Sequence, residues 1–305
     1  MTRRFLTVAL VVLAALTVPA AVAGKSPAPI RLPFHVKNGL ILIDGRVDST
    51  PGVFMLDTGE TYFRFVLNRN YVPLGPGTDL YRMHAESGQV SMTQVHDGTH
   101  TIELGGAFAT TAESGDPKAP HQAVSDDFRS MMHNVDPKIL GVIGYAFLKQ
   151  YDFTIDYARG VVALYPLGLA PKPTGSISIA FVPSSPPVPF TLKFGGADIP
   201  AVLDTGGWEE LKAPQSVWTQ LESGGFAKDA SGEGKDCVTL SGARYGAAPE
   251  FAIPHVDKAV TQKEEKLTLG YPFLRRYLNI YSSRDGTVTL VPLRNVSLLP
   301  PESCE

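Results

Sequence analysis

The sequence predicts a mainly β protein with two similar lobes, each a closed, barrel-like set of strands with short helices, related by a pseudo-two-fold axis. Three observations lead to this fold class. Short β-branched runs are bounded by turn residues along most of the chain. The tripeptide Asp-Thr-Gly occurs twice after an apolar run, at Asp57–Gly59 and Asp204–Gly206. Each copy is followed by a glycine after a mostly apolar stretch, at Gly144 and Gly270.

The two halves of the chain repeat in register. Ile30 and Ile177 each lie 27 residues before the aspartate of their own half. From Gly144 and from Gly270 onward, the halves align without a gap and share ten identical pairs, among them Tyr145/Tyr271, Phe147/Phe273, Tyr151/Tyr277, Gly160/Gly286 and Pro166/Pro292. A period well above about 100 residues indicates a duplicated lobe, because solenoid repeats recur every 20 to 50 residues or so.

The first residues have the pattern of a secretory signal peptide over residues 1–23. Thr2-Arg3-Arg4 is a basic start, Phe5 to Val18 is apolar, and Ala21-Val22-Ala23 fits a cleavage site. The alternative is an uncleaved membrane anchor, but the apolar stretch is short for a span. We therefore expect an exported protein, periplasmic or secreted, with no stable membrane insertion after signal cleavage.

A chain of 305 residues can hold two domains with a core each. We expect an N-terminal lobe over residues 30–167 and a C-terminal lobe over residues 177–293. The proline- and glycine-containing segment 171–175 reads as a short linker, and residues 294–305 as a tail. The net charge of −3, with no basic run, makes nucleic acid an improbable partner.

Two cysteines, Cys237 and Cys304, are the only ones in the chain. In an oxidising compartment they can form one disulfide, which would attach the tail to the second lobe. On the chain-entropy model, closing a loop of about 68 residues contributes on the order of 4 kcal/mol. The alternative is two unpaired thiols.

The elements follow from local patterns. We expect strands at 40–43 before Asp44-Gly45, at 161–164 and at 287–290, since these runs are compact, rich in β-branched residues and near glycine. Asp97-Gly98 reads as the turn of a hairpin over residues 90–104, and the glycines before 199–203 as another turn. Helical patterns are few, and we expect short helices over residues 125–132, 145–150, 214–221 and 271–276.

The repeated motif suits carboxylate chemistry. Each aspartate supplies a carboxylate, each threonine hydroxyl can bond a neighbouring backbone group, and each glycine lets another backbone approach closely. If Asp57 and Asp204 face each other, they cannot both be charged without cost, so they share one proton. The ionised member can then activate a water, while the protonated member polarises a carbonyl and later protonates a leaving amine.

With these motifs the chain resembles the retropepsin-like and pepsin-like aspartic proteases, in particular bacterial exported proteins with two tandem retropepsin-like domains. The resemblance covers residues 30–293 and implies two acid-protease-like lobes. It implies a catalytic dyad of Asp57 and Asp204, with supporting contacts from Thr58, Gly59, Thr205 and Gly206. It also implies that Val142-Ile143-Gly144 packs beneath the first aspartate, and that the hairpin over residues 90–104 closes over the substrate as a flap.

The sequence departs from the family pattern after each glycine, where Glu60 and Gly207 replace the usual alanine or serine. A third carboxylate at Glu60 would raise the apparent pKa values of the dyad. The alternative is that Glu60 points to solvent or pairs with a base such as Arg64. Thr268 also replaces an apolar residue in the second glycine segment.

Two functions follow from the residues and the resemblance. The first is an aspartic endopeptidase, a monomer that cleaves a peptide or an unfolded protein. The second is a catalytically inactive protein that binds a peptide or a partner on the same fold. A third arrangement, in which each lobe pairs with its counterpart in a second molecule, is less simple. There is no His-Glu-x-x-His or Gly-x-Ser-x-Gly motif, so we expect no metal or other cofactor and no serine hydrolase.

Overall fold

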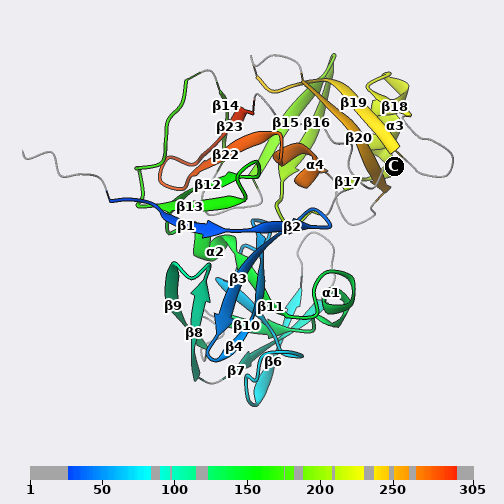
Figure 1. The fold of residues 1–305 in the computed structure, drawn as a ribbon. Coiled ribbons are helices and arrows are strands. Elements are labelled where there is room, and N and C mark those ends of the chain that lie inside the picture. Colours follow the sequence, from blue (N-terminus) through cyan, green and yellow to red (C-terminus); the bar gives the residue numbers. More distant parts are fainter. Residues whose placement is uncertain are drawn as a thin grey trace, which may run out of the picture.

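The computed structural model describes residues 27–83, 90–96, 98–114, 123–174, 176–181, 188–207, 210–229, 237–246, 251–260 and 266–293. The expected signal peptide over residues 1–23 and the tail over residues 294–305 lie outside these ranges. The described part is mainly β, with three sheets and four short helices (Figure 1). None of these helices has the length and apolarity that a membrane crossing requires.

A ten-stranded sheet is formed by residues of the first half and lies in the lower part of Figure 1. Its strands run in the order β6 (Gly77–Met83), β7 (Val90–His96), β10 (Ala123–Asp126), β5 (Phe65–Asn68), β11 (Ile139–Gly144), β4 (Thr50–Asp57), β3 (Leu40–Val47), β8 (Gly98–Leu104) and β9 (Phe108–Ser114), with β2 (His35–Lys37) beside β3. Two pairs in it are parallel, β4 with β11 and β5 with β10.

A seven-stranded sheet is formed by residues of the second half. Its order is β15 (Val188–Phe194), β16 (Ala197–Leu203), β21 (Leu267–Leu269), β17 (Glu210–Ala213), β20 (Phe251–Val260), β19 (Cys237–Arg244) and β18 (Ala227–Asp229). β15 also pairs with β19, so this sheet curls back on itself. Again two pairs are parallel, β16 with β21 and β17 with β20.

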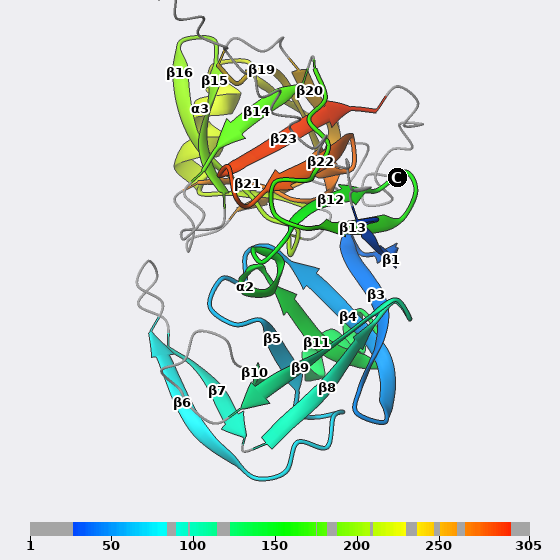
Figure 2. The ribbon, with the colours of Figure 1, turned by 90° about the vertical axis from the view of Figure 1, so that its left-hand side faces the viewer.

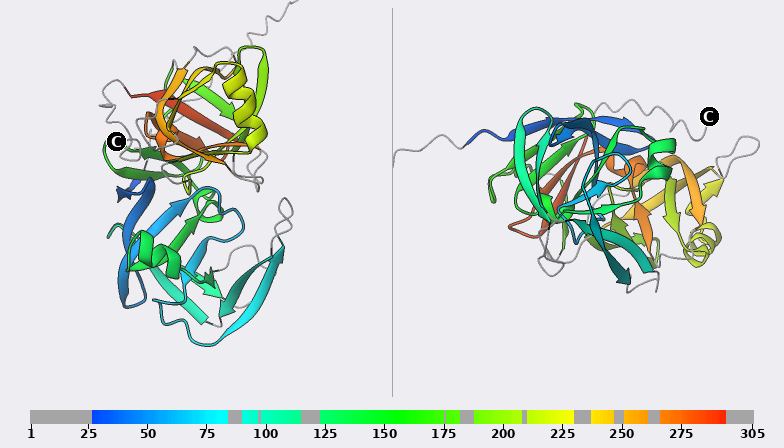
Figure 3. Two further views of the ribbon diagram at one scale, coloured as in Figure 1. Left: turned by 90° about the vertical axis from the view of Figure 1, so that its right-hand side faces the viewer. Right: turned by 90° about the horizontal axis from the view of Figure 1, so that it is seen from below.

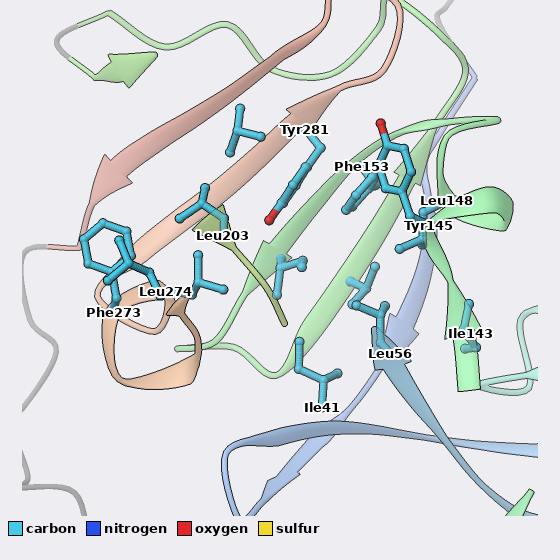
Figure 4. Packing of buried hydrophobic residues seen from close by; sticks show 14 of the residues in the cluster. Ile41, Leu56, Ile143, Tyr145, Leu148, Phe153, Leu203, Phe273, Leu274 and Tyr281 are labelled. Atoms are coloured by element: carbon cyan, nitrogen blue, oxygen red, sulfur yellow. The ribbon is translucent and has the colours of Figure 1, made fainter. Parts of the chain in front are cut away.

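A six-stranded sheet takes three strands from each half and joins them. Its order is β1 (Ile30–Pro33), β13 (Val161–Tyr165), β12 (Asp152–Asp156), β22 (Tyr277–Ser282), β23 (Thr287–Pro292) and β14 (Ile177–Ala180). The halves meet at the antiparallel β12–β22 pair, where Phe153 is opposite Tyr281. The main hydrophobic cluster runs across this junction, with side chains of both halves in contact with it (Figure 4).

The helices are α1 (Arg129–Asn134), α2 (Tyr145–Leu148), α3 (Gln215–Ser223) and α4 (Tyr271–Leu274). The expected helices at 145–150, 214–221 and 271–276 are confirmed, with shifted ends. Pro214 precedes the first residue of α3, where a missing N–H costs nothing. Val217, Trp218 and Leu221 form the buried face of α3, which appears in yellow-green beside the second-half strands in Figure 3.

The expected helix over residues 125–132 is wrong in its first half. Ser125 and Asp126 belong to β10, which pairs with β5 and β7, and α1 begins only at Arg129. Backbone pairing with two neighbouring strands outweighs the local pattern of this segment.

The strand expected at 40–43 is longer than predicted, because β3 continues through Asp44 and Gly45 to Val47. Gly45 lies opposite Gly52 on one side and Leu104 on the other. A methyl group on Gly45 would lie 2.5 Å from the carbonyl oxygen of Glu103 and 2.9 Å from the ring of Phe54. This glycine therefore permits close packing within a strand and does not end it.

The expected hairpin over residues 90–104 is wrong as well. β7 pairs with β6 and β10, whereas β8 pairs with β3 and β9. The hairpins are β6–β7 and β8–β9, both in the lower part of Figure 2. The expected turn before residues 199–203 is confirmed between β15 and β16.

Candidate active site

The two Asp-Thr-Gly motifs stand at the ends of buried strands. Asp57 is the last residue of β4, and Asp204 directly follows β16. In the parallel β4–β11 pair, Asp57 is level with Gly144. In the second half, the backbone N–H of Asp204 donates to the carbonyl of Leu269 on the neighbouring β21 at 3.2 Å. The two glycine segments noted in the sequence therefore flank the two aspartates.

Each threonine of the motif bonds the backbone of the other motif. The backbone N–H of Thr58 donates to Thr205 Oγ1 at 2.9 Å, and the backbone N–H of Thr205 donates to Thr58 Oγ1 at 3.0 Å. The two threonines are 2% and 1% exposed, so water cannot replace these bonds. The reciprocal pair joins segments 147 residues apart and fixes the two turns against each other.

Each glycine of the motif lies against the aspartate of the other motif. A methyl group on Gly59 would lie 2.8 Å from Asp204 Oδ2, and one on Gly206 would lie 2.5 Å from Asp57 Oδ1. Such separations are shorter than any real contact of a methyl carbon. Only glycine permits this approach, which brings the two carboxylates together.

The carboxylates are held by their own turns. Gly59 N–H donates to Asp57 Oδ1 at 2.7 Å, and Glu60 N–H donates to the same oxygen at 3.2 Å. In the second turn, Gly206 N–H donates to Asp204 Oδ1 at 2.8 Å. One oxygen of each carboxyl group is thus oriented by backbone donors, and no backbone donor among the described residues bonds the other.

Burial raises the pKa of Asp57 well above its usual value of 3.8, and the nearby charge of Asp204 and a side-chain hydrogen bond with Asp204 raise it further. The Gly59 N–H acts in the opposite direction. No cation is among the groups that shift this pKa. The pair is therefore arranged to share one proton.

Glu60 plays a local part beside the dyad. Its Oε1 accepts hydrogen bonds from the backbone N–H groups of Tyr62 at 2.9 Å and Phe63 at 3.0 Å. Its charge is the last of the causes that raise the pKa of Asp57. Glu60 therefore shapes the loop after the motif and adds a small electrostatic effect in the expected direction.

Gly144 continues this packing under the first motif. The Tyr145 N–H donates to the Glu60 carbonyl at 2.7 Å, and the Gly144 N–H donates to the Arg64 carbonyl at 2.9 Å. A methyl group on Gly144 would lie 2.8 Å from the same Glu60 carbonyl oxygen. The segment Val142-Ile143-Gly144 is therefore in contact with the loop that carries Asp57.

Sequence reasoning missed two tyrosines near the dyad, Tyr157 and Tyr281. Burial raises the pKa of both phenols most. The charge of Asp204 raises it further, as the second cause for Tyr281 and the last of four for Tyr157. The sequence contains a signal for them in the repeat itself. Tyr157 aligns with Ser283, and Tyr281 aligns with Ile155, whereas Tyr145, Phe147 and Tyr151 align with identical aromatic residues.

The cysteines lie away from the dyad motifs in sequence. Cys237 is 1% exposed and disulfide-bonded. Cys304, the only other cysteine of the chain, lies outside the described residues. Among the residues that are described, no three His, Cys, Asp or Glu side chains are grouped as metal ligands would be.

No protein-family model matches the chain, and a search of curated proteins finds no significant match.

Proposed function

We propose that this protein is an aspartic endopeptidase in which Asp57 and Asp204 share a proton and activate a water molecule. The observation that carries the proposal is the interlocking of the two motifs. Each threonine hydroxyl accepts a bond from the opposite backbone, and each glycine lies on the opposite carboxylate. A structural pair of acidic residues would need neither the reciprocal bonds nor the close approach.

The chain is proposed to consist of two retropepsin-like lobes related by a pseudo-two-fold axis. The parallel pairs support this, because β4–β11 and β5–β10 in one half have counterparts in β16–β21 and β17–β20 in the other. α2 and α4 also follow the two glycine segments at equivalent places. The lobes would span residues 30–167 and 177–293.

The proposed reaction is hydrolysis without a covalent intermediate. The ionised carboxylate takes a proton from water, and the resulting hydroxide forms a bond to the carbonyl carbon of the peptide. The protonated carboxyl group gives its proton to the carbonyl oxygen. Collapse of the tetrahedral diol breaks the C–N bond as the proton held by the dyad passes to the leaving amine. A diol hydroxyl gives its proton back to the dyad as the carbonyl forms again, which returns the dyad to its singly protonated state.

The substrate class is an extended peptide or an unfolded protein. Both carboxylates come from one chain, so the proposed site needs no second copy, and a monomer suffices. The signal-like pattern of residues 1–23 supports an exported protein, periplasmic or secreted.

Cleavage of an unfolded protein at acidic and neutral pH tests this proposal. The wild type should produce fragments, while Asp57→Asn and Asp204→Asn should each lose at least about three orders of magnitude in kcat/KM, because neither half of the acid–base pair works alone. Asp198→Asn is a matched control, since Asp198 is an exposed carboxylate paired with Lys193. Its activity should equal that of the wild type.

A wild type that cleaves nothing at any pH would contradict the enzymatic proposal. If the same protein still binds peptides, and if Asp57→Asn binds them equally well, the alternative of an inactive peptide-binding protein would replace it.

A further inference from the structure

Glu60 bonds to three parts of the first half through three different groups. Its backbone N–H donates to Asp57 Oδ1 at 3.2 Å. Its backbone carbonyl accepts from the N–H of Tyr145, the first residue of α2, at 2.7 Å. Its side-chain Oε1 accepts from the backbone N–H groups of Tyr62 at 2.9 Å and Phe63 at 3.0 Å. Glu60 therefore joins the dyad, the helix after the glycine segment and the loop beyond the motif.

The loop from Glu60 to Phe63 is fixed at both ends. At its far end, Phe63 is 9% exposed and packs in the hydrophobic cluster that also contains Val66 and Val142. At its near end, the side chain of Glu60 lies so close to Gly144 that a methyl group there would be 3.0 Å from Glu60 Cγ. Hydrogen bonds to a carboxylate are among the stronger ones in proteins. The Glu60 side chain thus closes a loop whose first N–H group bonds Asp57.

The second half holds its motif without such a side chain. Gly207 occupies the position that matches Glu60. Its N–H donates to the Asp204 carbonyl at 3.3 Å, and a methyl group on it would lie 3.2 Å from Cα of Gly270. Among the described residues, Asp204 Oδ1 accepts from one backbone donor, Gly206, whereas Asp57 Oδ1 accepts from two. Close backbone packing fixes the second turn, and a side chain fixes the first.

We propose that Glu60 is a positioning residue of the dyad, whose carboxylate fixes the loop over residues 60–63 and thereby holds two backbone donors on Asp57 Oδ1. The inference rests on the proposed function for its catalytic consequence. Two donors on one oxygen restrict rotation of the Asp57 carboxyl group, and they leave its other oxygen for the proton shared with Asp204. Glu60 thereby does for the first turn what the Gly207–Gly270 packing does for the second.

Two substitutions separate this positioning from the charge of Glu60. Burial and the charge of Asp204 are the larger causes of the raised pKa of Asp57, and both stay in place in these variants. The charge of Glu60 also raises this pKa, whereas the bond from the Gly59 N–H lowers it. Glu60→Gln removes the charge but keeps an oxygen that can accept from Tyr62 and Phe63. Glu60→Ala removes both the charge and the acceptor.

The titration of Asp57 by NMR, with ¹³C-labelled aspartate, is the first test. We expect the pKa of Asp57 to fall by about 0.3 unit or more in Glu60→Gln, because a neighbouring negative charge is lost. In Glu60→Ala it should be at least about 0.3 unit higher than in Glu60→Gln, because loosened donors favour the charged carboxylate less. Glu103→Gln and Glu103→Ala are matched controls, since Glu103 is exposed on β8 and is not among the groups that shift this pKa. Both should leave it unchanged.

Peptide cleavage by the same variants is the second test. Glu60→Ala should lower kcat by at least about 10-fold, because the Asp57 carboxyl group is no longer held in the reacting geometry. Glu60→Gln should restore kcat to within about threefold of the wild type, since the loop keeps its bonds. Should Glu60→Ala fail to fold, Glu60→Met takes its place, because it keeps the length of the side chain without an oxygen.

Equal pKa values for Asp57 in Glu60→Ala and Glu60→Gln would overturn the proposal, because the acceptor would then have no effect on the dyad. A Glu60→Gln enzyme as slow as Glu60→Ala would overturn it as well, since the charge alone would matter. An inactive wild type would overturn the proposed function, and the NMR comparison would still decide on the role of Glu60.

Discussion

At the scale of single residues, the lack of a side chain at two glycines matters to the site as much as the aspartates do. Gly59 and Gly206 contribute no side chain, and this lets each backbone turn lie on the carboxylate of the opposite half. The threonines between them bond across the same boundary. The residues of the short motif therefore act together, and none of them forms the site alone.

Gly59→Ala and Gly206→Ala should each separate the carboxylates, because the new methyl group would overlap Asp204 or Asp57. We expect a loss of about 1–3 kcal/mol in the free energy of unfolding from overpacking. We also expect a fall of at least about 100-fold in kcat/KM from misplaced reacting groups. Chemical denaturation and peptide cleavage measure the two effects.

Gly196→Ala is the control for these variants, since a methyl group there meets nothing within 4 Å and its backbone is not in the left-handed region. It should match the wild type in both measurements. Equal behaviour of Gly59→Ala and Gly196→Ala would show that the close approach of the two motifs is not needed.

The paired motifs and their glycines could be predicted because each is local and occurs twice. Tyr281 and Tyr157 could not be predicted, because their importance comes from where β12 and β22 meet in the sheet. The only hint in the sequence is that the two halves differ at these positions. Ile155 aligns with Tyr281, and Ser283 aligns with Tyr157.

At the scale of elements, strand pairing decides what the local pattern leaves open. The segment at Ser125 has helical character in sequence but is a strand, since β10 fits between β5 and β7. Asp97-Gly98 resembles a hairpin turn, yet the strands on either side pair with other neighbours. Long-range pairing of this kind cannot be derived from turn residues alone. Three of the four short helices could be predicted more easily, because proline or glycine marks where they begin.

The β6–β7 hairpin replaces the incorrectly predicted hairpin over residues 90–104. Its base is fixed by His96, which is buried. His96 Nδ1 lies 3.1 Å from the Gly75 carbonyl, so this nitrogen carries the proton. His96 Nε2 then accepts from Ser125 Oγ at 2.6 Å on the adjacent β10. A side-chain hydrogen bond thus attaches the hairpin to the sheet, in addition to the backbone pairing of β7 with β10.

Ser125→Ala should lower the free energy of unfolding by about 1–3 kcal/mol, because Ser125 is fully buried and water cannot replace the lost donor to His96. Denaturant unfolding measures the change. Ser130→Ala, at an exposed position of α1, should change stability by no more than about 0.5 kcal/mol. If the free energies of unfolding of Ser125→Ala and Ser130→Ala are equal, the bond between Ser125 and His96 does not anchor the hairpin.

At the scale of the whole molecule, the six-stranded sheet holds the two halves together and the dyad lies where they meet. This arrangement places a carboxyl pair in a buried environment, which costs stability when the pair is charged. The raised pKa of Asp57 means that the folded protein binds this proton more tightly than the unfolded chain does. Stability from this group is therefore present at low pH and is lost as the pH rises toward the folded-state pKa.

Asp57→Asn should remove this cost, since the amide stays neutral at every pH. We expect its melting temperature at pH 7 to exceed that of the wild type by about 2 °C or more, with the difference shrinking near pH 3.5. Calorimetry at the two pH values measures it. A variant that is less stable than the wild type at pH 7 would mean that Asp57 is ionised and well satisfied in the fold.

The most direct measurement of the shared proton is a titration of the aspartate carboxyl groups by NMR with ¹³C-labelled aspartate. The signal that is missing in Asp57→Asn identifies Asp57. We predict that this signal titrates well above 3.8 in the wild type, and that its pKa falls in Asp204→Asn, where the charge and hydrogen bond of the neighbour are changed. A signal that titrates near 3.8, or one that Asp204→Asn does not move, would contradict the central claim.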